Sequence, residues 1–158
     1  MKLAIVFLLL SHVLVAQEDK KVMEPIHQLF AAMKKGDSAM ARKVFHPVAK
    51  LYSVYHDKTG QPVLKGDASD GFLKAIGTPH KEVWNELIWS PKIEIDGNFA
   101  QVWVPYGFYV DKTFSHCGVD AFQLFKNAEG QWKIFHLADT RQKEGCVIPK
   151  EVSAQLEK

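Results

Sequence analysis

The residues best suited to chemistry lie in the last third of the chain, on segments with the pattern of neighbouring strands. Asp120 is flanked by apolar positions, and His116 and His136 fall close to it when the strands are aligned. A carboxyl group in such surroundings is either partnered or has a raised pKa. Carboxyl and imidazole groups of this kind serve as general acids and bases. Asp120, His116 and His136 are therefore the candidate catalytic residues.

Three turn signals set the alignment of these strands, at Gly97-Asn98, at residues 111–113 and around Glu129. Side chains alternate between the faces of a sheet with period two, so one face collects a defined set. That set is Ile93, Ile95, Val102, Val104, Tyr106, Phe108, His116, Gly118, Asp120, Phe122, Leu124, Ile134, His136, Ala138 and Thr140. A slip of one residue would move a strand's members of this set to the other face.

This face is apolar at one end and polar at the other. Apolar walls with a few convergent polar groups are the usual form of a ligand pocket. The candidate ligand-binding residues, on this face or at its mouth, are Tyr106, Phe108, Phe122, Thr140, Trp84 and Trp89. The competing interpretation is that Asp120 and a histidine only satisfy each other inside the core.

The opposite face is also apolar over a wide area. It carries Trp103, Tyr109, Val119, Ala121, Phe125, Phe135 and Leu137, with Lys133, Asp139 and Arg141. The helices of so short a chain cannot cover both faces, and a large exposed apolar patch is typical of an interaction surface. We therefore expect a homodimer built face to face on this sheet.

Three helices are expected before the long strands. Residues 18–35 carry apolar side chains at helical spacing, and Gly36 supplies a left-handed stop. Asp37 caps a second short helix that runs to Phe45, and Asp67 opens a third.

Strand patterns fill the rest of the chain. Residues 51–55 are rich in β-formers, a turn at 56–60 leads to a return strand, and everything from Glu82 onward predicts long antiparallel strands. Helices followed by strands in this order favour an α+β fold, with about three N-terminal helices packed on one curved, mostly antiparallel sheet.

The first sixteen residues have the pattern of a signal peptide. Lys2 is followed by an apolar run to Ala16 that is shorter than the ~20 residues needed to span a bilayer. We expect cleavage after Ala16, export to the periplasm or beyond, and no membrane segment afterwards. A buried N-terminal helix is the alternative. The rest, residues 17–158, is expected to form one domain with a core at about 20–142 and a tail at 143–158.

The composition limits the classes of partner and cofactor that we expect for this chain. The net charge is only +2 and lysines alternate with acids, which argues against nucleic-acid binding. No two histidines have metal-ligand spacing on one helix, and no phosphate loop or other cofactor motif occurs, so neither a metal nor a cofactor is expected. Cys117 and Cys146 are expected to pair if the chain is exported, with two unpaired buried thiols as the alternative.

Several of these features together resemble a known family. The run from Gly118 to Phe125, the turn with Gly130, the segment Trp132-Lys133-Ile134 and the step His46-Pro47 resemble the NTF2-like superfamily, over roughly residues 20–142. The ending from His116 through Asp139-Thr140-Arg141 to Cys146 is similar to exported bacterial members of the SnoaL-like and putative lumazine-binding groups. The resemblance implies a cone-shaped domain that hosts many unrelated functions.

The resemblance leaves two functions open. The first is a dimeric module, without catalysis, whose cone holds a small apolar or aromatic molecule or serves only a structural role. The second is a cofactor-independent isomerase, cyclase or lyase in which Asp120 acts with His116 or His136. Similarity to ketosteroid isomerase would imply a base after the first strand, where Asp57 stands. That carboxyl lies in a solvated turn, and residues 18–35 contain no tyrosine, so the isomerase pattern is mostly unmet.

Overall fold

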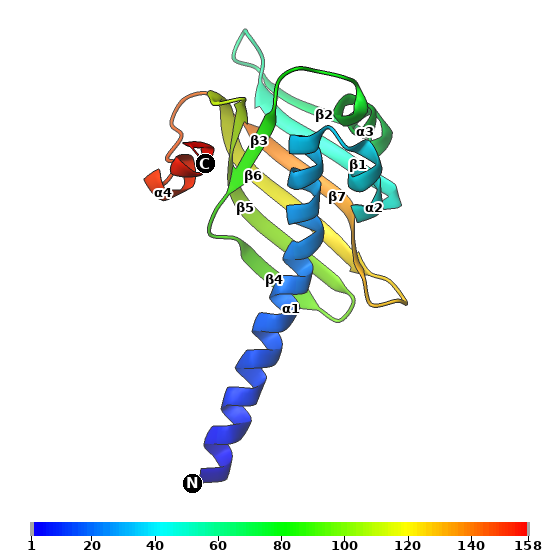
Figure 1. Cartoon of the computed structure of the whole chain (residues 1–158), viewed down its shortest axis with the longest axis vertical. Coiled ribbons are helices and arrows are strands. Elements are labelled where there is room, and N and C mark those ends of the chain that lie inside the picture. Colours follow the sequence, from blue (N-terminus) through cyan, green and yellow to red (C-terminus); the bar gives the residue numbers. More distant parts are fainter. Residues whose placement is uncertain (1, 158) are drawn as a thin grey trace.

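The computed structural model describes residues 2–157, and the side chains of residues 17–157. Of the expected signal peptide, Met1 and the side chains of residues 2–16 lie outside this description. Their backbone continues helix α1 (Lys2–Lys35), and Figure 1 shows this first half of the helix extending away from the sheet. No helix in the described part of the chain is long and apolar enough to cross a membrane.

Helix α1 packs on the sheet through the stripe that the sequence predicts. The buried side chains of this stripe are Val22, Met23, Ile26, Leu29, Phe30 and Met33. Gly36 ends the helix with φ of +65°, in the left-handed region that glycine tolerates. The Asp37 carboxylate then accepts a hydrogen bond from the Met40 amide at 2.8 Å and caps α2 (Ser38–Val44). The predicted helix break is therefore confirmed.

The third helix begins later than predicted. Strand β2 (Pro62–Ala68) pairs antiparallel with β1 (Phe45–His56) up to Ala68 opposite Lys50, so Asp67 is still part of a strand. Helix α3 (Ser69–Gly77) follows without a side-chain cap. Backbone pairing in the hairpin outweighs the local capping signal at Asp67.

A single curved sheet carries helices α1, α2 and α3 on one side (Figure 1). Its further strands are β3 (Trp84–Ile88), β4 (Lys92–Asp96), β5 (Phe99–Val110), β6 (Thr113–Lys126) and β7 (Trp132–Arg141). The strand order is β2-β1-β7-β6-β5-β3, with β4 also paired to β5. Among these strands, only β1 and β7 run parallel. The predicted α+β fold and its three N-terminal helices are confirmed.

The predicted alignment of β4, β5 and β6 is confirmed. Ile93 pairs with Val102, Phe108 with His116 and Val104 with Asp120. The loop between β5 and β6 is shorter than the predicted residues 111–113, because Thr113 already pairs with Val110, and a register shift between Phe108 and Tyr109 restores the predicted pairs beyond it.

The predicted alignment of β7 is wrong by one residue. Ile134 pairs with Leu124 as expected from alternation, but His136 pairs with Gln123 and Leu137 with Phe122, which leaves Phe135 as the extra residue of a β-bulge. Every later residue of β7 therefore changes face. His136, Ala138 and Thr140 leave the concave face, and Leu137, Asp139 and Arg141 join it.

The C-terminal tail returns to the convex face. Cys117 and Cys146 form the predicted disulfide, with their Cα atoms 6.0 Å apart. Beyond it, α4 (Lys150–Ser153) and a short 3₁₀ turn (Ala154–Glu157) lie beside β3 (Figure 1). Ile148 of this tail covers Gly107 and leaves no room there for a Cβ atom. The tail thus covers one corner of the convex face, which was expected to be bare.

Candidate functional site

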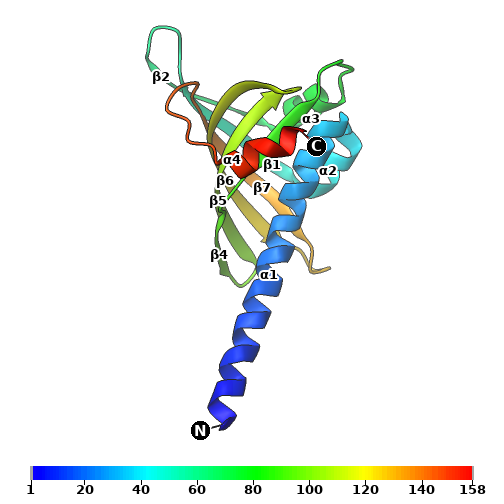
Figure 2. The ribbon, with the colours of Figure 1, turned by 60° about the vertical axis from the view of Figure 1, so that its left-hand side comes forward.

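A cavity of about 400 Å³ lies between the concave face of the sheet and helices α1 and α3. Figure 2 shows these helices on one side of the curved sheet. Leu29, Phe30 and Met33 of α1 and Phe72 of α3 form its apolar wall. A wider polar hollow shares Ser53, His116 and Arg141 with it, so the cavity is connected to solvent.

Two carboxyl groups face each other at the polar end. Asp120, on β6, is only 2% exposed, and its side chain is within hydrogen-bonding reach of Glu86 on β3. Burial, and then the charge of Glu86, raises the pKa of Asp120 well above its usual range. Burial also raises the pKa of Glu86, to about 7. Asp120 Oδ2 has no hydrogen-bond partner among the described residues.

A third carboxyl group, Asp139 on β7, is held by hydrogen bonds. Ser53 Oγ on β1 donates to Asp139 Oδ1 at 2.5 Å, and Arg141 Nε donates to Asp139 Oδ2 at 2.5 Å. A second, longer contact joins Arg141 Nη2 to Asp139 Oδ1 at 3.4 Å. The guanidinium group thus neutralises Asp139 at the mouth of the cavity.

Tyr106, on β5, ties the polar end to the last turn of β7. Its hydroxyl donates to the Thr140 carbonyl oxygen at 2.8 Å and lies 3.3 Å from Asp139 Oδ2. This contact requires Gly118, because a Cβ atom there would lie 1.8 Å from the Thr140 carbonyl oxygen. Burial raises the pKa of Tyr106, so its hydroxyl stays protonated at neutral pH.

His116 stands at the mouth of the cavity beside two aromatic rings. Its ring centroid is 5.0 Å from that of Phe108 and 5.7 Å from that of Tyr106. Burial, and then the charge of Arg141, lowers the pKa of His116 to about 4. The imidazole is therefore neutral at physiological pH.

The structure gathers most, but not all, of the predicted site residues. Those that line the cavity are Asp120, His116, Tyr106, Phe108 and Trp84. Phe122 lies below it in the core, where its ring packs against Phe30 with centroids 6.2 Å apart. The other three predicted residues lie elsewhere.

The bulge in β7 explains two of these three differences. His136 faces the convex side, with its ring 5.4 Å from that of Tyr52. Thr140 contributes its carbonyl group to Tyr106, while its hydroxyl accepts from the Val119 amide at 3.0 Å. Trp89 lies in a separate small hollow beside the disulfide.

Sequence reasoning missed four polar residues of the site, namely Glu86, Asp139, Arg141 and Ser53. Glu86 had a usable signal, because it is the only charged residue in the strand Trp84–Ile88 and alternates with Trp84 on one face. No pattern in the sequence indicated that Asp139 and Arg141 face the cavity, since only the bulge turns them inward. Among the described residues, no three His, Cys, Asp or Glu side chains are placed to hold a metal ion.

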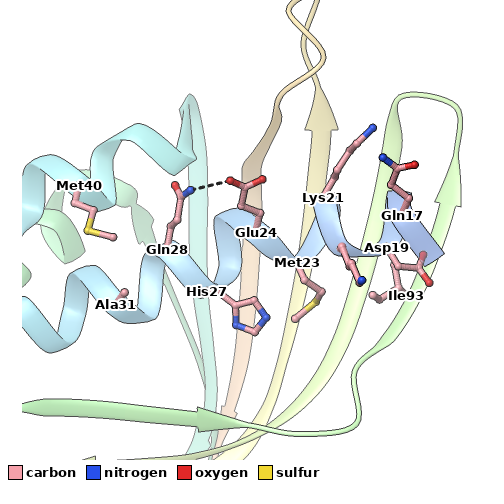
Figure 3. Close-up of a pocket in the computed structure, with 11 residues that line it drawn as sticks. Gln17, Asp19, Lys21, Met23, Glu24, His27, Gln28, Ala31, Met40 and Ile93 are labelled. Atoms are coloured by element: carbon pink, nitrogen blue, oxygen red, sulfur yellow. Dashed lines mark hydrogen bonds between the residues drawn. The ribbon is translucent and has the colours of Figure 1, made fainter. Parts of the chain in front are cut away.

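A second hollow, of about 750 Å³, runs along α1 (Figure 3). Gln28 Nε2 donates to Glu24 Oε1 at 3.3 Å on one side of the helix, whereas His27 points to the other side. These polar groups are exposed and do not converge. The cavity inside the cone is therefore the candidate site.

Comparison with known families identifies the fold. A family model described as "Putative lumazine-binding" matches residues 17–136. The chain belongs to this family. Its architecture is the NTF2-like cone that the sequence resembles. No protein of curated function matches the sequence.

Solved structures agree on the fold. An NTF2-like protein of unknown function from Shewanella baltica shares 20% identity with a TM-score of 0.61, over 82% of this chain and 97% of that chain. A putative ketosteroid isomerase from Shewanella frigidimarina shares 19% identity with a TM-score of 0.56, over 75% and 94%. The β subunit of a putative aromatic-ring-hydroxylating dioxygenase from Novosphingobium aromaticivorans shares 12% with a TM-score of 0.66, over 84% and 95%. Identities this low establish a common fold and leave function open.

Proposed function

We propose that this protein is an exported, dimeric binding domain whose cone holds a small, flat, largely apolar or aromatic molecule. The observation that carries this proposal is the cavity of about 400 Å³, apolar along its helical wall and polar at one end. Ligand-binding cavities commonly have this size and combine mostly apolar walls with a few polar groups.

Aromatic side chains make the cavity suited to a flat ligand. Trp84 and Phe108 line it with their ring centroids 6.4 Å apart, and His80 stacks on Trp84 at 4.5 Å. Such rings favour offset or edge contacts with a further ring. The family description refers to lumazine, a flat heteroaromatic molecule, and a ligand of that general shape agrees with these walls.

Export and dimerisation are supported by separate features. The leader pattern and the Cys117–Cys146 bond both agree with an oxidising compartment. On the convex face, Trp103, Phe125 and Phe99 remain 52%, 42% and 40% exposed, outside the corner that the tail covers. A second copy placed on this patch would remove it from water.

Native mass spectrometry of the full chain, expressed with its leader and purified under mild conditions, tests export, dimerisation and ligand binding together. We expect a dimer of chains that lack residues 1–16, each carrying one disulfide, with a small molecule bound. Matched tryptophan variants separate the two faces. Trp84→Ala should lose the ligand and keep the dimer, whereas Trp103→Ala should keep the ligand and weaken the dimer. A cone that stays empty and also fails to take up added lumazine would contradict the binding function.

One observation favours a second candidate, an acid–base isomerase or lyase. Glu86 has its pKa raised to about 7 by burial, the range in which a carboxyl group can both accept and return a proton. In such a reaction Glu86 would take a proton from a carbon next to a ligand carbonyl group and return it to another atom. The recovered ligand, incubated in heavy water, should then gain deuterium with the wild type and not with Glu86→Gln or Asp120→Asn. Equal exchange in all three would exclude this candidate.

A further inference from the structure

We propose that the occupant of the cone carries a positively charged nitrogen, and that the Glu86–Asp120 pair receives it. This inference rests on the proposed binding function and narrows it to one class of ligand, an aromatic or otherwise apolar amine.

The two hydroxyl donors at the polar end and two of the five N–H groups of Arg141 are already used, and the rest of that guanidinium is half exposed at the mouth. The Tyr106 hydroxyl donates to the Thr140 carbonyl oxygen, and Ser53 Oγ donates to Asp139. Arg141 directs its Nε and one terminal nitrogen to the same carboxylate. His116 adds at most one N–H, and its Nδ1 lies 3.0 Å from Ser115 Oγ.

Acceptors, in contrast, are left over. Asp120 is 98% buried, lines the cavity and has no N–H or O–H donor within reach of Oδ2 among the described residues. Glu86, beside it, shares at most one proton with Asp120 and receives no other hydrogen bond from the described side chains. Buried acceptors without a donor from the described residues call for a ligand that supplies N–H groups.

The charges around the cavity point the same way. Three carboxyl groups line it, on β3, β6 and β7, against one guanidinium group that is already paired with Asp139. His116 on β6 is neutral because its pKa is lowered, and Tyr106 on β5 stays protonated. The wall formed by α1 and α3 adds only apolar side chains. Once Glu86 has lost its proton, an ammonium group would therefore meet an uncompensated negative charge, whereas a carboxylate would be repelled.

Aromatic rings next to the pair add to this preference. Trp84 is on the same strand and the same face as Glu86, and Phe108 pairs directly with Glu86 across β3 and β5. The faces of such rings attract cations as well as flat apolar groups. A short arylalkylamine satisfies both features, since its ring fits the apolar wall and its ammonium group reaches the carboxyl groups.

Three probes with one indole body and different ends test the inference, namely tryptamine, tryptophol and indolepropionate. Isothermal titration of the full protein should show tryptamine binding about tenfold or more tighter than tryptophol at pH 8, because a charge-assisted hydrogen bond replaces a neutral one. Tryptamine should bind roughly tenfold tighter at pH 8 than at pH 6, since Glu86 must lose its proton, and the heat should depend on the buffer because that proton is released.

Variants test whether the Glu86–Asp120 pair causes the preference for tryptamine. Glu86→Gln, or Asp120→Asn if the first does not fold, should bind tryptophol as before and lose the preference for tryptamine. Glu94→Gln, the same change at an exposed carboxyl group on β4, should behave as wild type.

The outcomes separate this inference from the function on which it rests. Tryptophol or indolepropionate binding as tightly as tryptamine would overturn the amine preference and leave the binding function intact. A preference that survives Glu86→Gln and Asp120→Asn would also overturn it. Binding of none of the three probes would overturn the inference, while the binding function would still be judged by the mass of the recovered protein.

Discussion

The two ends of the cone are built from the same strands and behave as opposites. At the closed end, Val102, Phe122, Leu124 and Ile134 are at most 1% exposed and pack beneath α1. At the open end, inward positions further along the same strands carry Tyr106, Asp120 and Asp139. The closed end stabilises the fold by removing apolar surface from water.

The open end costs stability instead. Burial raises the pKa of both Glu86 and Asp120, so the ionised form of either carboxyl group is unfavourable there. Local arrangements that weaken a fold are typical of sites kept for function. The comparison therefore predicts that truncating the core at the closed end lowers stability, whereas removing a buried carboxyl group at the open end raises it.

The largest effect is expected at the closed end. Phe122→Ala removes a ring that is 1% exposed and packed edge to face on Phe30, and it should lower the free energy of unfolding by about 4 kcal/mol. Chemical denaturation measures this. The exposed Phe114, changed to alanine, is the control and should cost under about 1 kcal/mol. Equal losses would mean that the closed end is not the main core.

The next effect is expected where the open end depends on close backbone contact. Gly118→Ala places a Cβ atom against the Thr140 carbonyl oxygen, so the end of β7 must move. Overpacking of this kind should cost about 3 kcal/mol and should displace Asp139 and Arg141 from the cavity. Thermal unfolding and the binding of the probes above measure the two consequences. Gly71→Ala on α3, where the nearest atom is a flexible Asp67 oxygen at 3.2 Å, should be nearly neutral.

The smallest effect has the opposite sign and depends on pH. The pKa of Glu86 is about 7 in the folded state, above the ordinary value of 4.5, so the folded protein binds more protons than the unfolded chain between these limits. Wild-type stability should fall as pH rises through this window. Glu86→Gln should remove that fall and be more stable than wild type by roughly 2 kcal/mol at pH 8, once solvent at the open mouth is allowed for.

Denaturation of both forms at pH 4.5 and pH 8 checks this sign. The two should differ little at the lower pH, and Glu94→Gln should follow the wild type throughout. A Glu86→Gln variant that is less stable than wild type at pH 8 would show that Glu86 contributes to the fold rather than straining it.

The closed end could be predicted from the sequence because its signals are local and agree with each other. Turn signals at Gly97-Asn98 and near Asp111 align β4, β5 and β6, and alternation then assigns Val102 and Phe122 to the concave face. The open end could be predicted only in part. Which residues of β7 line the open end depends on the bulge at Phe135, and no turn or periodicity in the sequence marks that residue.

The sequence by itself determined the α+β order, the buried stripe of α1 and the inward position of Asp120, and it predicted the Cys117–Cys146 pair on the condition of export. Each follows from composition, from spacing or from contacts close along the chain. Only the tertiary structure decided that Asp139 replaces His136 and that Glu86, on a strand more than thirty residues away, becomes the partner of Asp120. A one-residue bulge reverses every side chain after it, and contacts between distant strands leave no local trace in the sequence.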